Sequence, residues 1–227
     1  MAENKNQTQE QLKNIEESLT KAEMYVEKNK NSLIVIVLAI ALGFCAYFAY
    51  NRLYVQPLEN EANTELFMAE KNFEAGKYQE ALDGDDQFLG LLDIIEDFGG
   101  TQTANLAEYY AGVSYLRLGN AEEAISHLDN FSSEDDILAP IAKGAIGDAF
   151  AELDQKEEAL NYYIAAAELR TNNFTTPIYL MKAAKTAEAL GDKNQALKLY
   201  TRIQDEFSKS REAQQVSKYI SRITAAQ

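Results

Sequence analysis

An uninterrupted apolar run from Leu33 to Tyr50 constrains this chain more than any other feature. No charged residue lies between Lys30 and Arg52, so the uncharged span at 31–51 is 21 residues long. A helix rises about 1.5 Å per residue, and one of this length crosses the roughly 30 Å hydrocarbon core of a bilayer. The sequence therefore predicts one membrane-spanning helix, followed by a water-soluble domain.

Two other interpretations of this run are disfavoured. A removed secretory signal has an apolar core of about 7–15 residues and a small-residue cleavage pattern behind it. This run is longer, follows a polar stretch of about 30 residues and has no such pattern. Lipid attachment at Cys45 is disfavoured because the bulky Phe44 precedes it, so Cys45 is expected to be a small apolar residue within the membrane.

The flanking residues predict the orientation of the span. Positive charge close to a span tends to stay on the cytoplasmic side, and aromatic rings favour the interface. The relevant residues are Lys21, Lys28 and Lys30 before the run, Arg52 after it, and Tyr47, Phe48, Tyr50 and Tyr54 at its far end. We expect a cytoplasmic N-terminus and, in a bacterium, an inner-membrane protein with a periplasmic C-terminal domain.

The rest of the chain repeats one pattern four times. A small residue is followed seven positions later by Gly or another turn residue, and five positions after that by Ala with Leu or Ile behind it. The alanines that anchor the pattern are Ala81, Ala124, Ala159 and Ala196, which lie 43, 35 and 37 residues apart. These spacings are close to the roughly 34-residue period of a helix-turn-helix repeat.

The packing of paired helices explains this pattern. Small residues such as Gly112 and Ala184 let two antiparallel helices approach closely, and the glycines at 76, 119 and 191 end each first helix in a left-handed cap. Each hairpin leaves an apolar face that only a neighbouring hairpin covers. The expected fold is all-α: a single transmembrane helix, then an α-solenoid of about four helical hairpins with a capping helix near residues 211–224.

Two segments lie outside the pattern. The insertion at 83–92 predicts a lengthened second helix, with its amphipathic part from Gln87 to Phe98. Near the N-terminus a capping box precedes an amphipathic stripe that is too short for a stable coiled coil. The box is Thr8 and Gln11, and the stripe is Leu12, Ile15, Leu19, Ala22 and Val26. The expected parts are a cytoplasmic arm (1–31), the transmembrane helix (32–51) and the repeat domain (52–227).

The four windows resemble the tetratricopeptide family, and the order of arm, membrane helix and repeats resembles the YfgM-like family of ancillary SecYEG translocon subunits. The phrases LAEYYAG at 106–112, GDAF at 147–150 and NFTTP at 173–177 carry the second resemblance. It implies a chaperone-like periplasmic subunit. Its implied partners are the SecYEG translocon, a PpiD-type membrane-anchored prolyl isomerase, and unfolded or emerging secreted proteins. The alternative is a structural scaffold or adaptor of another cell-envelope complex, for secretion or cell-wall assembly.

No group of residues predicts catalysis. The only histidine, His127, lies in an expected second helix with no Cys or second His nearby to share a metal, so a surface histidine is predicted. The repeat glycines fall at expected helix ends rather than in a phosphate-binding loop. We expect no enzymatic activity, no metal and no cofactor.

The net charge of −15 is unevenly distributed. Residues 51–142 hold 19 acidic and 4 basic side chains, whereas residues 143–227 hold 11 and 12. The first of these regions should repel nucleic acid and attract basic segments of partner proteins. The alternative is a solvated acidic face that only aids solubility.

The tetratricopeptide resemblance also implies a concave protein-binding groove lined by the first helix of each hairpin. Its implied residues are Leu66, Glu70, Phe73, Tyr109, Val113, Leu116, Gly144, Asp148, Ala151, Met181, Lys185 and Glu188. Ordinary packing between repeats is the alternative role. A clamp for a C-terminal carboxylate is disfavoured, because its basic and Asn positions hold Glu70, Val113 and Asp148.

Overall fold

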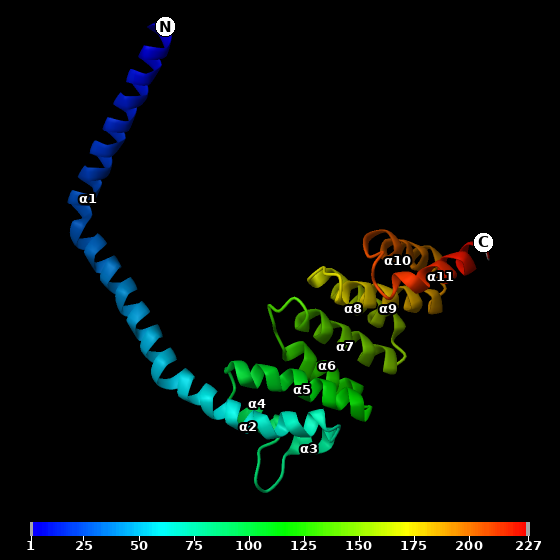
Figure 1. Ribbon diagram of the computed structural model, residues 1–227. Coiled ribbons are helices and arrows are strands. Elements are labelled where there is room, and N and C mark those ends of the chain that lie inside the picture. Colours follow the sequence, from blue (N-terminus) through cyan, green and yellow to red (C-terminus); the bar gives the residue numbers. More distant parts are fainter. Residues whose placement is uncertain (1, 226–227) are drawn as a thin grey trace. The chain divides into compact units, whose positions relative to one another are not determined.

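The computed structural model describes the backbone of residues 2–225 and the side chains of residues 24–225 (Figure 1). The chain divides into two compact units, Met1–Pro57 and Leu58–Gln227. Within the described backbone the regular structure is helical, and only Gly84 and Leu89 pair as an isolated β-bridge. The expected all-α class is confirmed.

The first unit consists of α1 (Ala2–Tyr50) and the π-helical turn η1 (Asn51–Val55). An apolar 18-residue window in this helical stretch has a mean hydropathy of 2.6, and none of it is buried within the protein. By length and composition alone this helix is able to cross a membrane, a test that a signal sequence also passes. The predicted stripe of the arm lies, apart from Val26, outside the residues whose side chains are described.

Helices of the second unit follow one another in chain order, from cyan α2 to red α11 in Figure 1. Each of the later helices packs on the one before it, from α5 onward. The helices are α2 (Gln56–Glu74), α3 (Tyr78–Asp83), α4 (Leu91–Asp97), α5 (Gln102–Leu118), α6 (Ala121–Asn130), α7 (Leu138–Glu152), α8 (Lys156–Leu169), α9 (Thr175–Ala189), α10 (Lys193–Glu206) and α11 (Ala213–Ala225). The pairs α2/α3, α5/α6, α7/α8 and α9/α10 are the predicted hairpins, and α11 is the predicted capping helix.

One turn geometry joins the two helices of every hairpin. The first or second residue after the first helix has a positive φ in each case, at Gly76, Gly119, Asp154 and Gly191. The next residue donates its backbone N–H to the carbonyl five positions earlier, with N–O distances of 2.9 Å in all four turns. This bond closes a left-handed helix cap and satisfies a carbonyl that the helix end would leave unpaired. The predicted caps are confirmed.

The insertion does not lengthen the second helix, and this prediction is wrong. Helix α3 ends at Asp83, and a short loop at residues 84–90 leads into the separate helix α4. The two glycines that close the loop touch: a Cβ added to Gly84 would lie 2.4 Å from the Gly90 nitrogen. A side chain at either position would collide with the opposite backbone, so the chain pinches here instead of continuing as a helix.

Small residues bring the paired helices together, as predicted. A Cβ added to Gly112 of α5 would lie 2.5 Å from Cγ of Leu128, which is buried in α6. The repeat alanines Ala81, Ala124 and Ala159, like Ala196, are fully buried. These crossings form part of the core, whose clusters also join neighbouring hairpins.

Candidate protein-binding surfaces

The residues predicted to line a groove differ in exposure. Leu66 and Met181 are buried in the core, which corresponds to the packing alternative, as does the buried Gly144, whose added Cβ would lie 1.9 Å from the Tyr179 ring. Ala151 and Lys185 are exposed, and the remaining predicted residues are half-buried. The half-buried ones are Glu70, Phe73, Tyr109, Val113, Leu116, Asp148 and Glu188. Their role in binding stays a prediction.

Aromatic rings from the first two hairpins pack in a row. Phe73 of α2 lies edge-on to Tyr110 of α5, with 4.9 Å between ring centres, and Tyr110 lies beside Tyr109 at 5.6 Å. The Tyr110 hydroxyl donates to Glu70 over 2.6 Å. Burial and this carboxylate together raise the pKa of Tyr110, so the hydroxyl stays a neutral donor at physiological pH.

In the third hairpin a carboxylate joins three helices. Asp148 of α7 accepts a hydrogen bond of 2.7 Å from the Tyr163 hydroxyl of α8 and forms an ion pair of 2.7 Å with Lys182 of α9. Burial and the neighbouring carboxylate raise the pKa of Tyr163. The Lys182 ammonium also lies 5.5 Å from the centre of the Tyr163 ring. One carboxylate thus ties the third hairpin to the fourth.

The fourth hairpin repeats this arrangement with other residues. Glu188 of α9 accepts from the Tyr200 hydroxyl of α10 over 2.8 Å and pairs with Arg222 of α11 at 2.7 Å. Asp148 and Lys182 are 34 residues apart, and so are Glu188 and Arg222. A third pair, Glu168 with Arg202, has the same separation. These pairs were not predicted, although an acidic residue followed one repeat period later by a basic one is a signal that identifies them.

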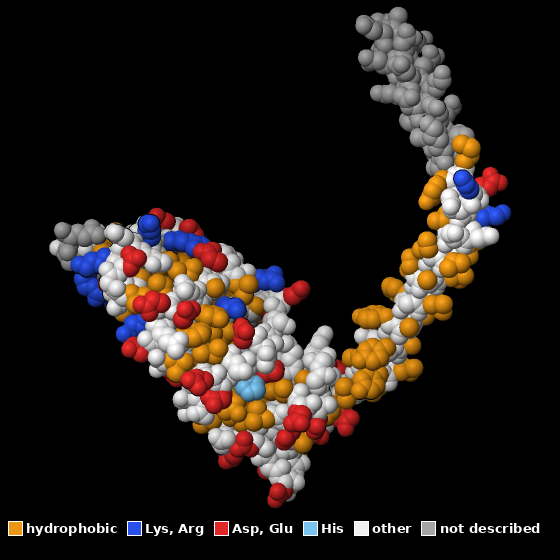
Figure 2. Space-filling view, turned by 180° about the vertical axis from the view of Figure 1, so that it is seen from behind, with side chains coloured by type: hydrophobic (Ala, Val, Ile, Leu, Met, Phe, Trp, Pro, Cys, Tyr) orange, Lys and Arg blue, Asp and Glu red, His pale blue; other side chains and the backbone are white. Residues whose placement is uncertain are grey.

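His127 is partly exposed, as Figure 2 shows, but it also has contacts that the sequence does not predict. Its side chain is 21% exposed, and its Nδ1 lies 2.6 Å from a carboxylate oxygen of Glu108. Its ring stacks on Tyr115 at 5.3 Å between centres. The histidine therefore joins α6 to α5 within the second hairpin, a contact that depends on side chains 19 residues apart.

A carboxylate of α2 caps the start of α5. Glu59 accepts from the backbone N–H groups of Gln102 and Thr103 at 2.7 and 3.0 Å, and from the Thr103 hydroxyl at 2.6 Å. Thr101 caps the same helix by accepting from the Ala104 N–H at 3.0 Å. A negative charge at a helix N-terminus is stabilised by the unpaired N–H groups and the helix dipole. The first hairpin is held to the second by this contact.

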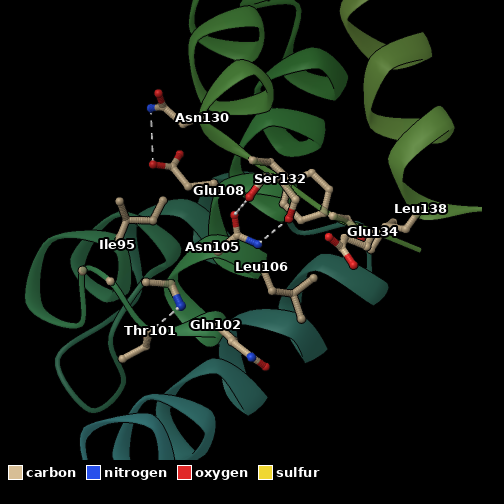
Figure 3. A pocket seen from close by; sticks show the side chains of 15 residues that line it. Ile95, Thr101, Gln102, Asn105, Leu106, Glu108, Asn130, Ser132, Glu134 and Leu138 are labelled. Atoms are coloured by element: carbon tan, nitrogen blue, oxygen red, sulfur yellow. Dashed lines mark hydrogen bonds between the residues drawn. The ribbon is translucent and has the colours of Figure 1, made fainter. Parts of the chain in front are cut away.

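A depression of about 760 Å³ lies between α4, the start of α5 and the loop at 131–137. None of the predicted groove residues lines it. Figure 3 shows Asn105 pointing to the loop, where its side chain accepts from the Ser132 N–H and donates to the Ser132 carbonyl, both over 2.9 Å. Most of the side chains labelled in Figure 3 are polar. The depression therefore offers both hydrogen-bond donors and acceptors. Among the described residues, no group of three or more His, Cys, Asp or Glu side chains could hold a metal ion.

The two charge regions of the sequence lie on different parts of the second unit. In Figure 2 the Lys and Arg side chains gather towards the C-terminal end, whereas the opposite end carries Asp and Glu side chains and almost no positive ones. The acidic region corresponds to residues up to 142 and includes α2 to α6. The solenoid therefore presents an acidic end and a mixed end.

Comparison with known proteins identifies the repeats. Residues 106–135 and 179–210 match the tetratricopeptide repeat family, and these segments cover most of the α5/α6 and α9/α10 hairpins. Tetratricopeptide repeat protein 8 of Caenorhabditis elegans is 29% identical over 132 residues, which are 56% of this chain and 25% of that protein. The chain thus spans about a quarter of the length of this relative.

Two solved structures share the fold. Both are tetratricopeptide-like repeats of a putative kinesin light chain from Podosopora anserina, one of them carrying a single substitution. Each is 14% identical and covers 74% of this chain and 87% of its own, with TM-scores of 0.56 and 0.55. At this identity the likeness concerns the fold alone. The chain carries tetratricopeptide repeats arranged as an α-solenoid.

Proposed function

We propose that this chain is a membrane-anchored tetratricopeptide adaptor that acts as an accessory, chaperone-like subunit of the SecYEG translocon in a bacterial inner membrane. Tetratricopeptide repeats are scaffolds for protein–protein interaction rather than catalysis. The observation that carries the proposal is an apolar helix with none of its 18-residue window buried, joined to a stack of such repeats. Bare apolar side chains on this scale require a lipid or protein cover.

The acidic end supports a role in holding basic partner segments. Exposed carboxylates of α6 lie in its first turn, at Glu122 and Glu123. In the same positions of α8 stand Glu157 and Glu158, where the surrounding residues are balanced in charge. An acidic surface attracts basic segments over a distance set by salt, so its effect extends beyond residues in direct contact.

Co-purification tests the partner. The full chain, extracted in a mild detergent, should bring SecY and SecE in near-stoichiometric amounts together with a PpiD-type isomerase. A different envelope assembly complex without SecY would contradict the proposal and favour the scaffold alternative. Protease added to spheroplasts should remove the C-terminal domain and spare the N-terminal arm, because the lysines before the span hold that side in the cytoplasm.

A matched pair of variants tests the acidic end. The double change Glu122→Gln with Glu123→Gln should weaken co-purification and make it less sensitive to salt, because it removes two charges from the acidic region. The double change Glu157→Gln with Glu158→Gln removes the same charge from the same helical positions in the balanced region, and it should leave binding unchanged. Equal effects of the two changes would mean that the location of the acidic charge is irrelevant to the partner.

A further inference from the structure

Three positive charges surround the ring of Tyr219 in α11. The Nζ of Lys185 lies 5.7 Å from the centre of this ring, the Nζ of Lys218 4.8 Å and the guanidinium carbon of Arg222 5.1 Å. Lys185 belongs to α9, whereas the other two belong to α11. Helices α9 and α11 thus bring three cations to one aromatic ring. We call Tyr219 and these three residues the Tyr219 cluster.

The ring at the centre of this cluster is firmly supported. Tyr219 stacks on Tyr200 with 5.1 Å between ring centres and 10° between their planes. Tyr200 is fully buried, and its hydroxyl is held by Glu188. A ring fixed in this way has little freedom left to lose when a ligand contacts it, which favours binding.

The charge of the cluster is only partly compensated. Arg222 pairs with Glu188, whereas Lys185 and Lys218 form no ion pair within the described part of the chain. Both lysines are exposed. Three cations within 5.7 Å of one ring centre, against one carboxylate, leave a net positive charge there, and like charges repel one another. A ligand that carries carboxylates would relieve this repulsion.

We propose that the Tyr219 cluster binds an acidic peptide segment of a partner protein. Carboxylates of the segment would pair with Lys185 and Lys218, and an apolar side chain between them would contact the ring. The acidic end of the solenoid repels such a segment, so it is directed to the C-terminal end. This inference rests on the proposed adaptor function and gives the adaptor a second partner, opposite in charge to the one held by the acidic end.

Fluorescence anisotropy with the full chain in detergent micelles tests the inference. The probe is a labelled peptide of alternating Glu and Leu, with a Gln and Leu peptide as its uncharged match. We expect binding of the Glu peptide alone, weakening as salt rises from 0.1 to 1 M because the Debye length falls from about 10 to about 3 Å. The double change Lys185→Gln with Lys218→Gln should weaken binding by about tenfold, as expected for the loss of two exposed ion pairs.

A control pair removes the same charge elsewhere. Lys198 of α10 and Lys209 of the following loop are exposed, and replacing both with Gln should leave the affinity nearly unchanged. Replacing Lys185 and Lys218 with Arg should preserve binding, since it keeps both charges, and it serves as the folded reference if the Gln pair fails to fold. Binding that survives in the Gln pair, equal loss in both Gln pairs, or equal affinity for the two peptides would overturn the inference.

A second copy of this chain is the competing occupant, because its acidic end also carries the required charge. Sedimentation velocity of the full chain decides this point. Association that rises with protein concentration and disappears in the Lys185→Gln, Lys218→Gln protein, together with no binding of the Glu peptide, would replace the proposed partner with a second copy. Co-purification with SecYEG and its dependence on Glu122 and Glu123 do not involve these lysines, so the two proposals fail separately.

Discussion

Residues 58–142 and residues 143–225 build the same helical hairpins with different polar chemistry. In the second region two carboxylates on first helices each meet both a tyrosine and a cation: Asp148 meets Tyr163 and Lys182, and Glu188 meets Tyr200 and Arg222. In the first region the carboxylates that join the first hairpin to the second bond to neutral groups: Glu70 to the Tyr110 hydroxyl and Glu59 to backbone N–H groups. Both arrangements give the tyrosine hydroxyls an acceptor.

This difference distinguishes the charged side chains that stabilise the fold from those that remain available to partners or solvent. Neutral donors hold the acidic region together, so cations are not required there to join one hairpin to the next. Its excess of acidic side chains is therefore not neutralised within the fold and remains available to partners or solvent. In the other region three cations, Lys182, Arg202 and Arg222, join elements of neighbouring repeats through ion pairs.

The largest effect is expected where both regions share one requirement, the close approach of helices. Gly112→Leu should lower the free energy of unfolding by about 1–3 kcal/mol, because the new side chain collides with Leu128 and forces the helices apart. Thermal unfolding followed by circular dichroism measures this change. Ala151→Leu, at an exposed position, is the matched control. An unchanged Tm for Gly112→Leu would contradict the packing described at this crossing.

The link between the first and second hairpins is the next test. Glu59→Ala should lower the free energy of unfolding by about 1–2 kcal/mol, since it leaves N–H groups at the start of α5 without an acceptor. Glu59→Gln keeps one acceptor oxygen and should have a smaller effect. Chemical denaturation of the two variants measures both values. If the order is reversed, the capping contact is not what joins these hairpins.

Salt should distinguish the two polar chemistries directly. Asp148→Asn keeps an acceptor for Tyr163 but loses the ion pair with Lys182, at a cost of about 1 kcal/mol or less because this pair is partly exposed. The difference from the native protein should shrink in 1 M salt. Glu70→Gln keeps an acceptor for the neutral Tyr110 hydroxyl, so its smaller effect should not depend on salt. Equal salt dependence of both variants would remove the contrast between the regions.

The smallest effect concerns pH and the cap of α7. Asp135 accepts from the N–H groups of Ile137 and Leu138 at 2.8 and 2.7 Å, and these bonds hold the pKa of its carboxyl below its ordinary value of 3.8. Its contribution to stability is therefore present above pH 3.8 and lost as the pH falls through the lowered folded-state pKa. The Tm difference between the native protein and Asp135→Asn should vanish in acid. If the Tm difference stays constant from neutral to acidic pH, the charge of this carboxyl does not stabilise the start of α7.

The fold could be predicted because its signals are local. A glycine at position 119 and an alanine at 124 fix the end of one helix and the crossing of the next within a few residues. Asp154 takes the place of the glycine in the third hairpin, because aspartate enters the left-handed region more readily than most residues. The solenoid then follows, since no hairpin covers its own apolar face.

The errors arise where contacts depend on the folded chain. The pinched loop requires Gly84 and Gly90 to touch across six positions, whereas the apolar spacing of the segment suggested a helix. His127 meets Glu108 only after α5 and α6 have paired. The pairs separated by 34 residues could have been found from the repeat period, but which of them form depends on how neighbouring hairpins are rotated.

The pinched loop also offers a position from which the orientation of the protein can be measured. Its ends are fixed by two glycines, whereas Asp86 between them is exposed. The only native thiol, Cys45, lies in the apolar helix, so Cys45→Ala with Asp86→Cys gives a protein with one thiol on the surface of the repeat domain. A maleimide that cannot cross membranes would then report, from intact cells or spheroplasts, on which side this domain resides.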